Sequence, residues 1–379
     1  MPPSDHFRFG HRRLRFYAAF AFLAPVHLGM TWLCFALDHL LFPGFRRVEI
    51  RSPLFILGNF RTGSTFLYRR LARDSEAFAA FATREIYLTP SICQRKLWAL
   101  ARRIDALFGA PVRSFIHSFD DRVLEAVPYH KVGLSEPEED EGLFLYRWAS
   151  FFIWFFFPGS SRAFPIVSFD RSIAPARRRR LMRFYRRCVQ RHLYVHGPEK
   201  HFLSKNPAFT GKLRSLRSHF PDAKMVCLVR KPVELVPSMI NWFSVAWSYF
   251  GDTTTRYLFP EIVRDIAHFW YRYPLELATE KQAGTPAGDA LENLRFLSFE
   301  RLTGSFALAA EELYRFVGHA GDPHARGVVP QPEEVTERAR GLTPEAVGLS
   351  TEDIEKRFRG VMDAYTRLPP ERWIAGPGS

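Results

Sequence analysis

The 379-residue chain is 47% hydrophobic, so it can bury a full core, and its length fits one large catalytic domain with appendages. Lys and Arg outnumber Asp and Glu by 53 to 39, a net charge of +14, which predicts an anionic partner such as a nucleotide, a nucleic acid or a lipid head group. The four scattered cysteines form no CxxC pair and we find no histidine cluster at metal spacing, which argues for a reducing compartment and against structural zinc.

The N-terminal region contains a long apolar run. Phe16 to Leu37 reads FYAAFAFLAPVHLGMTWLCFAL, about as long as a bilayer-spanning helix requires. A proline, a histidine and a glycine interrupt the run, and arginines flank it on both sides, so the positive-inside rule gives no orientation. We expect residues 1–47 to be an apolar, helical, membrane-associating segment, either docked or single-pass. A buried helix is the alternative.

The rest of the chain, residues 48–379, reads as one α/β domain. Pro53 to Leu57 is a short apolar run typical of a buried strand, and Thr65 to Ala72 has helical spacing. Two further strands are predicted at Lys224 to Val229 and Leu294 to Phe299. Strands alternating with helical stretches predict a parallel sheet with helices on both faces.

The loop between the first strand and the first helix reads GNFRTGST. Gly58 and Gly63 have the spacing of a nucleoside triphosphate loop, but Ser64 occupies the position of its lysine, and Arg61 brings a cation into the loop instead. Backbone amides of a glycine turn at a helix N-terminus make an anion site. The pattern therefore predicts a site for a phosphate compound, with a glycine turn and an incidental arginine as the alternative.

This loop resembles the 5′-phosphosulfate loop of the sulfotransferases that use 3′-phosphoadenosine 5′-phosphosulfate (PAPS). The family also has an arginine at a later strand end and a serine eight residues on, matched here by Arg230 and Ser238. The resemblance covers about residues 53–318, toward a bacterial-type branch similar to the carbohydrate and tyrosylprotein enzymes. It implies a P-loop NTPase-like fold and a PAPS site formed by Arg61, Thr62, Gly63, Ser64, Thr65, Arg230 and Ser238.

The implied reaction moves a sulfuryl group from PAPS to a hydroxyl of an apolar, lipid-linked or carbohydrate acceptor, and no metal is expected. By resemblance, Arg61 neutralises the phosphosulfate and Lys205 supports the leaving oxygen. Two alternatives are a nucleotide-dependent kinase with a degenerate loop and a non-catalytic, membrane-docked nucleotide-binding protein. We expect contact with a membrane surface, no nucleic-acid partner, and a cytoplasmic, membrane-associated location.

The catalytic base is a separate question. In the cytosolic branch of the family the base is a histidine, but the matching stretch here is Lys-Asn-Pro, and Pro207 cannot accept a proton. Other branches use a glutamate soon after the first helix, which implies Glu85, in an apolar setting that would help if it raised the pKa. The alternative is a surface glutamate or an ion-pair partner of Arg84. His130, Glu138 and Asp140 are the next candidates.

Three other stretches each allow two interpretations. The acidic GLSEPEEDEGLF at 133–144 is interpreted as a solvated turn, with Glu138 and Asp140 as second candidates for acceptor contact. The arginine-rich helix from Arg177 to Arg191 is either a solvated basic face or a docking face for anionic lipid. The run WASFFIWFFFP at 148–158 is too short to span a bilayer, so it is a core helix or one wall of an apolar acceptor pocket.

Overall fold

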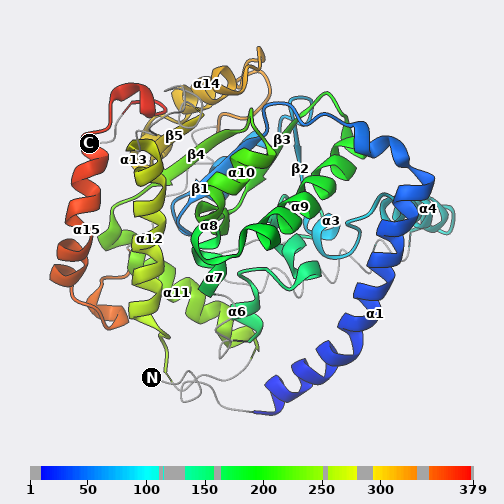
Figure 1. Cartoon of the computed structure of the whole chain (residues 1–379), viewed down its shortest axis with the longest axis horizontal. Helices are drawn as coiled ribbons and strands as arrows, with labels where there is room; N and C mark the ends of the chain where they lie inside the picture. The colour runs from blue at the N-terminus through cyan, green and yellow to red at the C-terminus, as the bar shows by residue number, and fades with distance from the viewer. Residues whose placement is uncertain are drawn as a thin grey trace.

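The core of the computed structural model is one parallel sheet (Figure 1). The structure describes residues 10–110, 114, 133–157, 164–250, 255–279, 293–330 and 341–376. The strand order is β2-β3-β1-β4-β5. The strands are β1 (Leu54–Gly58), β2 (Phe78–Ala80), β3 (His201–Lys205), β4 (Lys224–Val229) and β5 (Leu294–Ser298). The sheet confirms the predicted fold class and its three predicted strands, whereas β2 and β3 are missed by the sequence analysis.

Both faces of the sheet are covered by helices. Since successive side chains of a strand point to opposite sides, each strand contributes to two hydrophobic clusters. In β1, Phe55 and Leu57 belong to one hydrophobic cluster and Leu54 and Ile56 to the other. The first cluster includes side chains from α9 (Pro175–His196), α10 (Leu213–His219), α11 (Pro232–Phe250), α12 (Pro260–Thr279) and α15 (Thr351–Thr366). The second includes side chains from α2 (Ser64–Leu71), α13 (Phe299–Gly304) and α14 (Phe306–Val317).

Several shorter elements surround these layers. Further α-helices are α3 (Thr83–Tyr87), α4 (Ile92–Leu107), α6 (Ile153–Phe156), α7 (Phe164–Val167) and α8 (Phe169–Ser172). The 3-10 helices are η2 (Pro43–Arg47), η4 (Asp140–Arg147), η6 (Pro207–Lys212), η8 (Glu345–Val347) and η9 (Pro370–Arg372).

The end of β1 lies very close to β4. Gly58 has a φ of +113°, and a Cβ atom placed there would lie 2.5 Å from the carbonyl oxygen of Leu228 in β4. Glycine is therefore the one residue type that fits at this point of the sheet. The chain leaves β1 here and enters the loop that leads to α2.

The N-terminal helix α1 (His11–Leu41) is, among the described residues, the one helix long and apolar enough by length and composition to cross a membrane. Its last turns are nevertheless part of the domain. The buried carboxylate of Asp38 pairs with Arg191 of α9 at 2.8 Å and accepts hydrogen bonds from the amides of Ile92 and Cys93, which begin α4. The division at residue 47 stays a prediction, and packing is continuous across it, because Phe35 and Val48 share one cluster.

The Asp38–Arg191 pair gives a stability prediction. Asp38→Asn leaves the buried guanidinium without its counter-charge, so we expect the free energy of unfolding, measured with urea, to fall by about 3 kcal/mol. The control is Glu49→Gln, which breaks an exposed ion pair with Arg51 and should cost less than about 1 kcal/mol. Equal losses in the two variants would contradict the anchoring role of Asp38.

Candidate functional site

The loop after β1 is a tight turn that leads directly into α2. Arg61 has a φ of +67° and Gly63 a φ of +84°, and a Cβ atom on Gly63 would lie 2.8 Å from Leu302. The hydroxyl of Thr62 donates to the carbonyl of Asn59 at 2.8 Å and closes the turn. Because the first amides of a helix lack partners within the helix, the start of α2 at Ser64 offers hydrogen-bond donors to an anion.

The two halves of the predicted donor site meet in the structure. Arg61 Nε donates to Ser238 Oγ on α11 at 3.1 Å. Arg230, which follows β4, donates from Nη1 to the carbonyl of Arg61 at 3.0 Å and pairs with Glu234 at 3.0 Å. Its guanidinium lies over the ring of Phe299, 4.4 Å from the centroid. The loop, the residue after β4 and the helix that follows it therefore form one cationic site.

Lys205 lies next to this site, at the end of β3, where it is the register partner of Ile56 in β1. Its ammonium group is buried and pairs with Glu139. Glu139 belongs to the acidic stretch, which the sequence analysis predicts to be a solvated turn. That prediction is wrong, because Glu139, Asp140 and Glu141 are 5%, 1% and 0% exposed.

Each acid of this buried segment has a partner that explains its position. Glu141 pairs with the buried Lys212 at 2.6 Å. Asp140 accepts hydrogen bonds from Ser204 at 3.1 Å and Asn206 at 3.0 Å, and also from the hydroxyl of Tyr185. Burial raises the pKa of Asp140 to about 6 although these donors favour its charged form. The segment is thereby held against the carboxyl end of β3.

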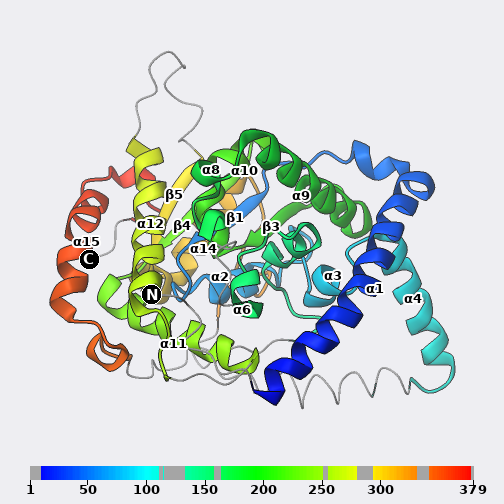
Figure 2. The same ribbon diagram turned by 60° about the horizontal axis from the view of Figure 1, so that its bottom comes forward.

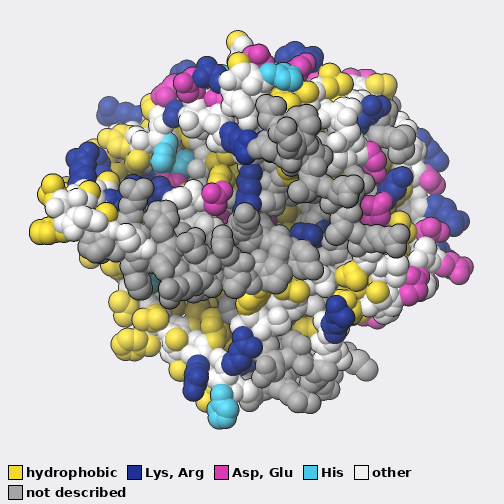
Figure 3. All heavy atoms as spheres, turned by 180° about the vertical axis from the view of Figure 1, so that it is seen from behind, with side chains coloured by type: hydrophobic (Ala, Val, Ile, Leu, Met, Phe, Trp, Pro, Cys, Tyr) yellow, Lys and Arg dark blue, Asp and Glu magenta, His cyan; other side chains and the backbone are white. Residues whose placement is uncertain are grey.

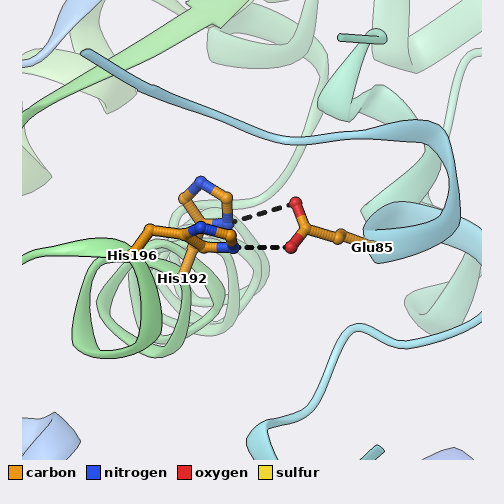
Figure 4. Close-up of side chains that lie close together, drawn as sticks. All are labelled: Glu85, His192 and His196. Atoms are coloured by element: carbon orange, nitrogen blue, oxygen red, sulfur yellow. Dashed lines mark hydrogen bonds and ion pairs between the residues drawn. The ribbon is translucent and has the colours of Figure 1, made fainter. Parts of the chain in front are cut away.

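Glu85, the predicted base, lies in a different cluster (Figure 4). Its Oε1 is bonded to His196 Nε2 at 2.6 Å, and its Oε2 lies 3.6 Å from His192 Nδ1 and accepts from the amide of Ala82. Arg95 Nε lies 3.9 Å from Oε1. Both oxygens therefore face α4, α9 and the first turn of α3.

The charges of this cluster act against a basic Glu85. Burial by itself would raise the pKa of Glu85, but Arg95 and then His192 and His196 outweigh burial and hold it well below its ordinary value. The pKa of Glu85 is therefore shifted in the direction opposite to the rise that would help a base. The predicted alternative partner was Arg84, whereas the ion pair forms with Arg95. A catalytic role for Glu85 stays a prediction, one that this environment disfavours.

The same cluster offers metal-ligand atoms. Those of Glu85, His192 and His196 lie within 4.8 Å of one another, and the two histidines stand four residues apart on α9, a spacing that the sequence analysis misses. However, Arg95 Nη1 lies 3.3 Å from His192 Nδ1, so a cation already occupies the lone pair that a metal would need. We interpret the cluster as a buried ion pair that joins α3, α4 and α9.

Aromatic rings border the loop on its other side. Phe60 stacks on the half-buried Trp242 of α11, with ring centroids 4.9 Å apart. The ring of Trp242 in turn meets that of Phe155 of α6 edge to face, with centroids 5.5 Å apart. Trp242 stands one turn after Ser238. Of the run at 148–158, Phe151 and Trp154 are buried in the core.

Comparison with known proteins agrees with this geometry. A model described as the Sulfotransferase family matches residues 53–323. The fold is similar to sulfotransferase STF9 from Mycobacterium avium, with a TM-score of 0.68, 17% identity, and coverage of 89% of this chain and 82% of that one. It is also similar to sulfotransferase STF1 from Mycobacterium tuberculosis H37Rv, with a TM-score of 0.57, 18% identity, and coverage of 86% and 82%. At these identities the likeness shows the fold alone. No curated protein sequence gives a significant match.

The environment of Glu85 predicts a structural role for this residue. Glu85→Gln leaves the buried Arg95 without its counter-charge, so we expect the free energy of unfolding at pH 7 to fall by about 3 kcal/mol. The control is Glu76→Gln, an exposed partner of Arg326, which should cost less than about 1 kcal/mol. If both variants unfold at the same urea concentration, the structural role is wrong.

The pH dependence of the Glu85 variant follows from the same interaction. Because the folded pKa of Glu85 is depressed, its stabilisation is complete above the ordinary value of 4.5 and is lost as the pH falls toward the folded pKa. The stability difference between the wild type and Glu85→Gln should therefore be constant near neutrality and shrink below that pH.

Proposed function

The chain belongs to the sulfotransferase family, and on this premise we propose that it moves a sulfuryl group from PAPS to a hydroxyl of an apolar or lipid-linked acceptor. The observation that carries the proposal is the 3.1 Å hydrogen bond from Arg61 to Ser238. It brings a loop suited to one phosphate group beside a second set of donors on α11 and after β4. A nucleoside with phosphate groups at the 3′ and 5′ positions of its ribose suits such a divided site.

The residues present fit the donor. Arg61, the hydroxyls of Thr62, Ser64 and Thr65, and the amides at the start of α2 would bind the 5′-phosphosulfate. Arg230 and Ser238 would bind the 3′-phosphate, because a guanidinium makes charge-assisted bonds to phosphate and a hydroxyl adds a neutral one. Gly63 lets the loop pass close to Leu302 and Phe299, where a side chain would clash.

The chemistry requires positioning and charge stabilisation. The bond between sulfur and the 5′-phosphate oxygen breaks while a bond from sulfur to the acceptor oxygen forms, and the acceptor's proton passes to a base. Arg61 would neutralise the departing phosphate, and Lys205 would stabilise the leaving oxygen. Glu139 pairs with the Lys205 ammonium group at the end of β3, so that the position of this group would be fixed before the donor binds.

We assign the base to Glu138 in preference to Glu85. The carbonyl of Glu138 accepts from the hydroxyl of Tyr68 on α2 at 3.3 Å, and the next residue pairs with Lys205. Glu138 is half-buried, beside the helix that begins at the proposed phosphosulfate site. Residue 138 is thus next to the partner of Lys205 and in contact with α2, whereas the carboxylate of Glu85 is enclosed by Arg95 and two histidines.

The aromatic side of the site supports an apolar acceptor. Trp242 and Phe60 stack next to Ser238, and Phe155 continues the row into α6. The next residue of α6, Phe156, stacks on Phe16 of α1, with ring centroids 6.0 Å apart. Aromatic residues therefore run from the loop through Trp242 and α6 to the apolar N-terminal helix, which supports an acceptor with an apolar part.

Binding of the donor product tests the assignment of Arg230. Arg230→Ala should weaken binding of adenosine 3′,5′-bisphosphate by about 10- to 100-fold, since it removes charge-assisted bonds to one phosphate. Binding of adenosine 5′-phosphate, which lacks the 3′-phosphate, should change little. Titration calorimetry measures both affinities. The control is Lys231→Ala, which removes the exposed neighbouring cation.

Equal losses for the two nucleotides would remove the assignment of Arg230.

The kinase alternative predicts a different pattern of ligand stabilisation in the wild type. A kinase should be stabilised against heat by ATP with magnesium, whereas the proposed sulfotransferase should be stabilised by the bisphosphate without magnesium. A non-catalytic binding protein would bind the bisphosphate but form no sulfated product from any lipid extract.

The choice of base can be tested with a matched pair of variants. Glu138→Gln should keep the stability and donor affinity of the wild type and lose about 10²- to 10⁴-fold in turnover with labelled PAPS and a lipid extract. Glu85→Gln should lose stability and, at a temperature where it is folded, keep most of its turnover. The reverse pattern would return the role to Glu85. His130, another candidate, lies outside the described residues.

A further inference from the structure

Helix α4 carries an apolar stripe that is largely exposed among the residues that the structure describes. Leu97, Leu100, Ile104 and Leu107 are 62%, 53%, 48% and 82% exposed. Their spacing places them on one face of the helix, the face that a helix of a soluble domain normally buries. The stripe continues into Phe108, which is 77% exposed.

Helix α1 lies beside α4 and exposes a second apolar face (Figure 2). Its most exposed large hydrophobic side chains are Leu14, Phe22, Leu23, Val26, Met30, Leu33, Leu40 and Leu41. Figure 3 shows hydrophobic side chains gathered along the left edge of the molecule, the side where α1 and α4 lie. We call the exposed faces of α1 and α4 together the α1–α4 surface.

The opposite face of α1 contacts the domain along nearly its whole length. Tyr17 donates to the carbonyl of Phe156 at 3.1 Å, near the start of the helix. Thr31 accepts from Gln94 of α4 at 3.1 Å, and Asp38 pairs with Arg191 near its end. From Tyr17 to Asp38 the helix rises about 32 Å at 1.5 Å per residue, which is roughly the thickness of a bilayer core. A helix that crossed the bilayer would lose these contacts, so they favour an α1 that lies along the domain.

The charges on the two helices indicate what covers the α1–α4 surface. Its exposed cations are Arg12, Arg15, Lys96, Arg102 and Arg103. The acids of the described parts of α1 and α4 are Asp38, which is buried in its ion pair, and Asp105. A second copy of the chain would place these cations against each other, whereas anionic lipid head groups would neutralise them.

We propose that the α1–α4 surface docks on an anionic lipid bilayer, with α1 and α4 lying in the plane of the interface. The exposed leucines and phenylalanines enter the acyl boundary, and the arginines and lysine bind head groups. This inference goes beyond the proposed function, because it assigns α4 to the membrane contact and does not depend on the identity of the reaction.

Vesicle flotation of the full chain tests the proposal. The wild type should float with phosphatidylcholine vesicles that contain phosphatidylglycerol, and at least about tenfold less with phosphatidylcholine alone, since several cations contribute. The variant Leu100→Ser/Ile104→Ser should lose about tenfold or more in binding to the mixed vesicles, since both side chains lose their contact with lipid. Its melting temperature and its affinity for adenosine 3′,5′-bisphosphate should match the wild type.

The control is Leu308→Ser, which removes a 42% exposed leucine from α14 and should float like the wild type. Three results would overturn the proposal. The first is an α4 variant that binds the mixed vesicles as well as the wild type does, and the second is a wild-type protein that fails to float with them. A wild-type dimer that becomes a monomer in the α4 variant, seen by light scattering, would show that a second copy covers the surface.

Discussion

The parallel pairing of β1 with β4 determines where the proposed donor site lies. Gly58 is the register partner of Leu228, and the strands come so close there that any side chain at position 58 would meet the backbone of β4. Because both strands end at the same edge of the sheet, the residues that follow them emerge side by side. Arg61 and Arg230 thereby come together, although they are far apart in the sequence.

Buried acids organise the rest of this edge. In a chain with a net charge of +14, the segment from Glu139 to Glu141 supplies counter-charges for Lys205 and Lys212. Removing either partner of such a pair would leave an uncompensated buried charge, so these pairs tie η4 to β3 and η6. The position of Lys205 is thus set by an acidic segment from another part of the chain, and Glu138 directly precedes that segment.

The sequence predicted the features that depend on local pattern. Short stretches of sequence encode the loop, the strand before Arg230 and the helix that carries Ser238. These stretches follow one another in the same order as in the family that the chain resembles. Strand β3 was missed because Ser204 and Lys205 interrupt its apolar residues, so that it lacks an apolar run. Partners distant in sequence were also missed. The enclosure of Glu85 requires Arg95 and two histidines of α9, and burial of the acidic stretch requires lysines that follow it by more than sixty residues.

The most direct measurement is a crystal structure of the chain with adenosine 3′,5′-bisphosphate. We expect the 5′-phosphate at the loop from Arg61 to Thr65 and the 3′-phosphate at Arg230 and Ser238, with the Arg61–Ser238 hydrogen bond replaced by bonds to the ligand. A ligand bound elsewhere, or bound with its 3′-phosphate in the loop, would contradict the proposed donor site.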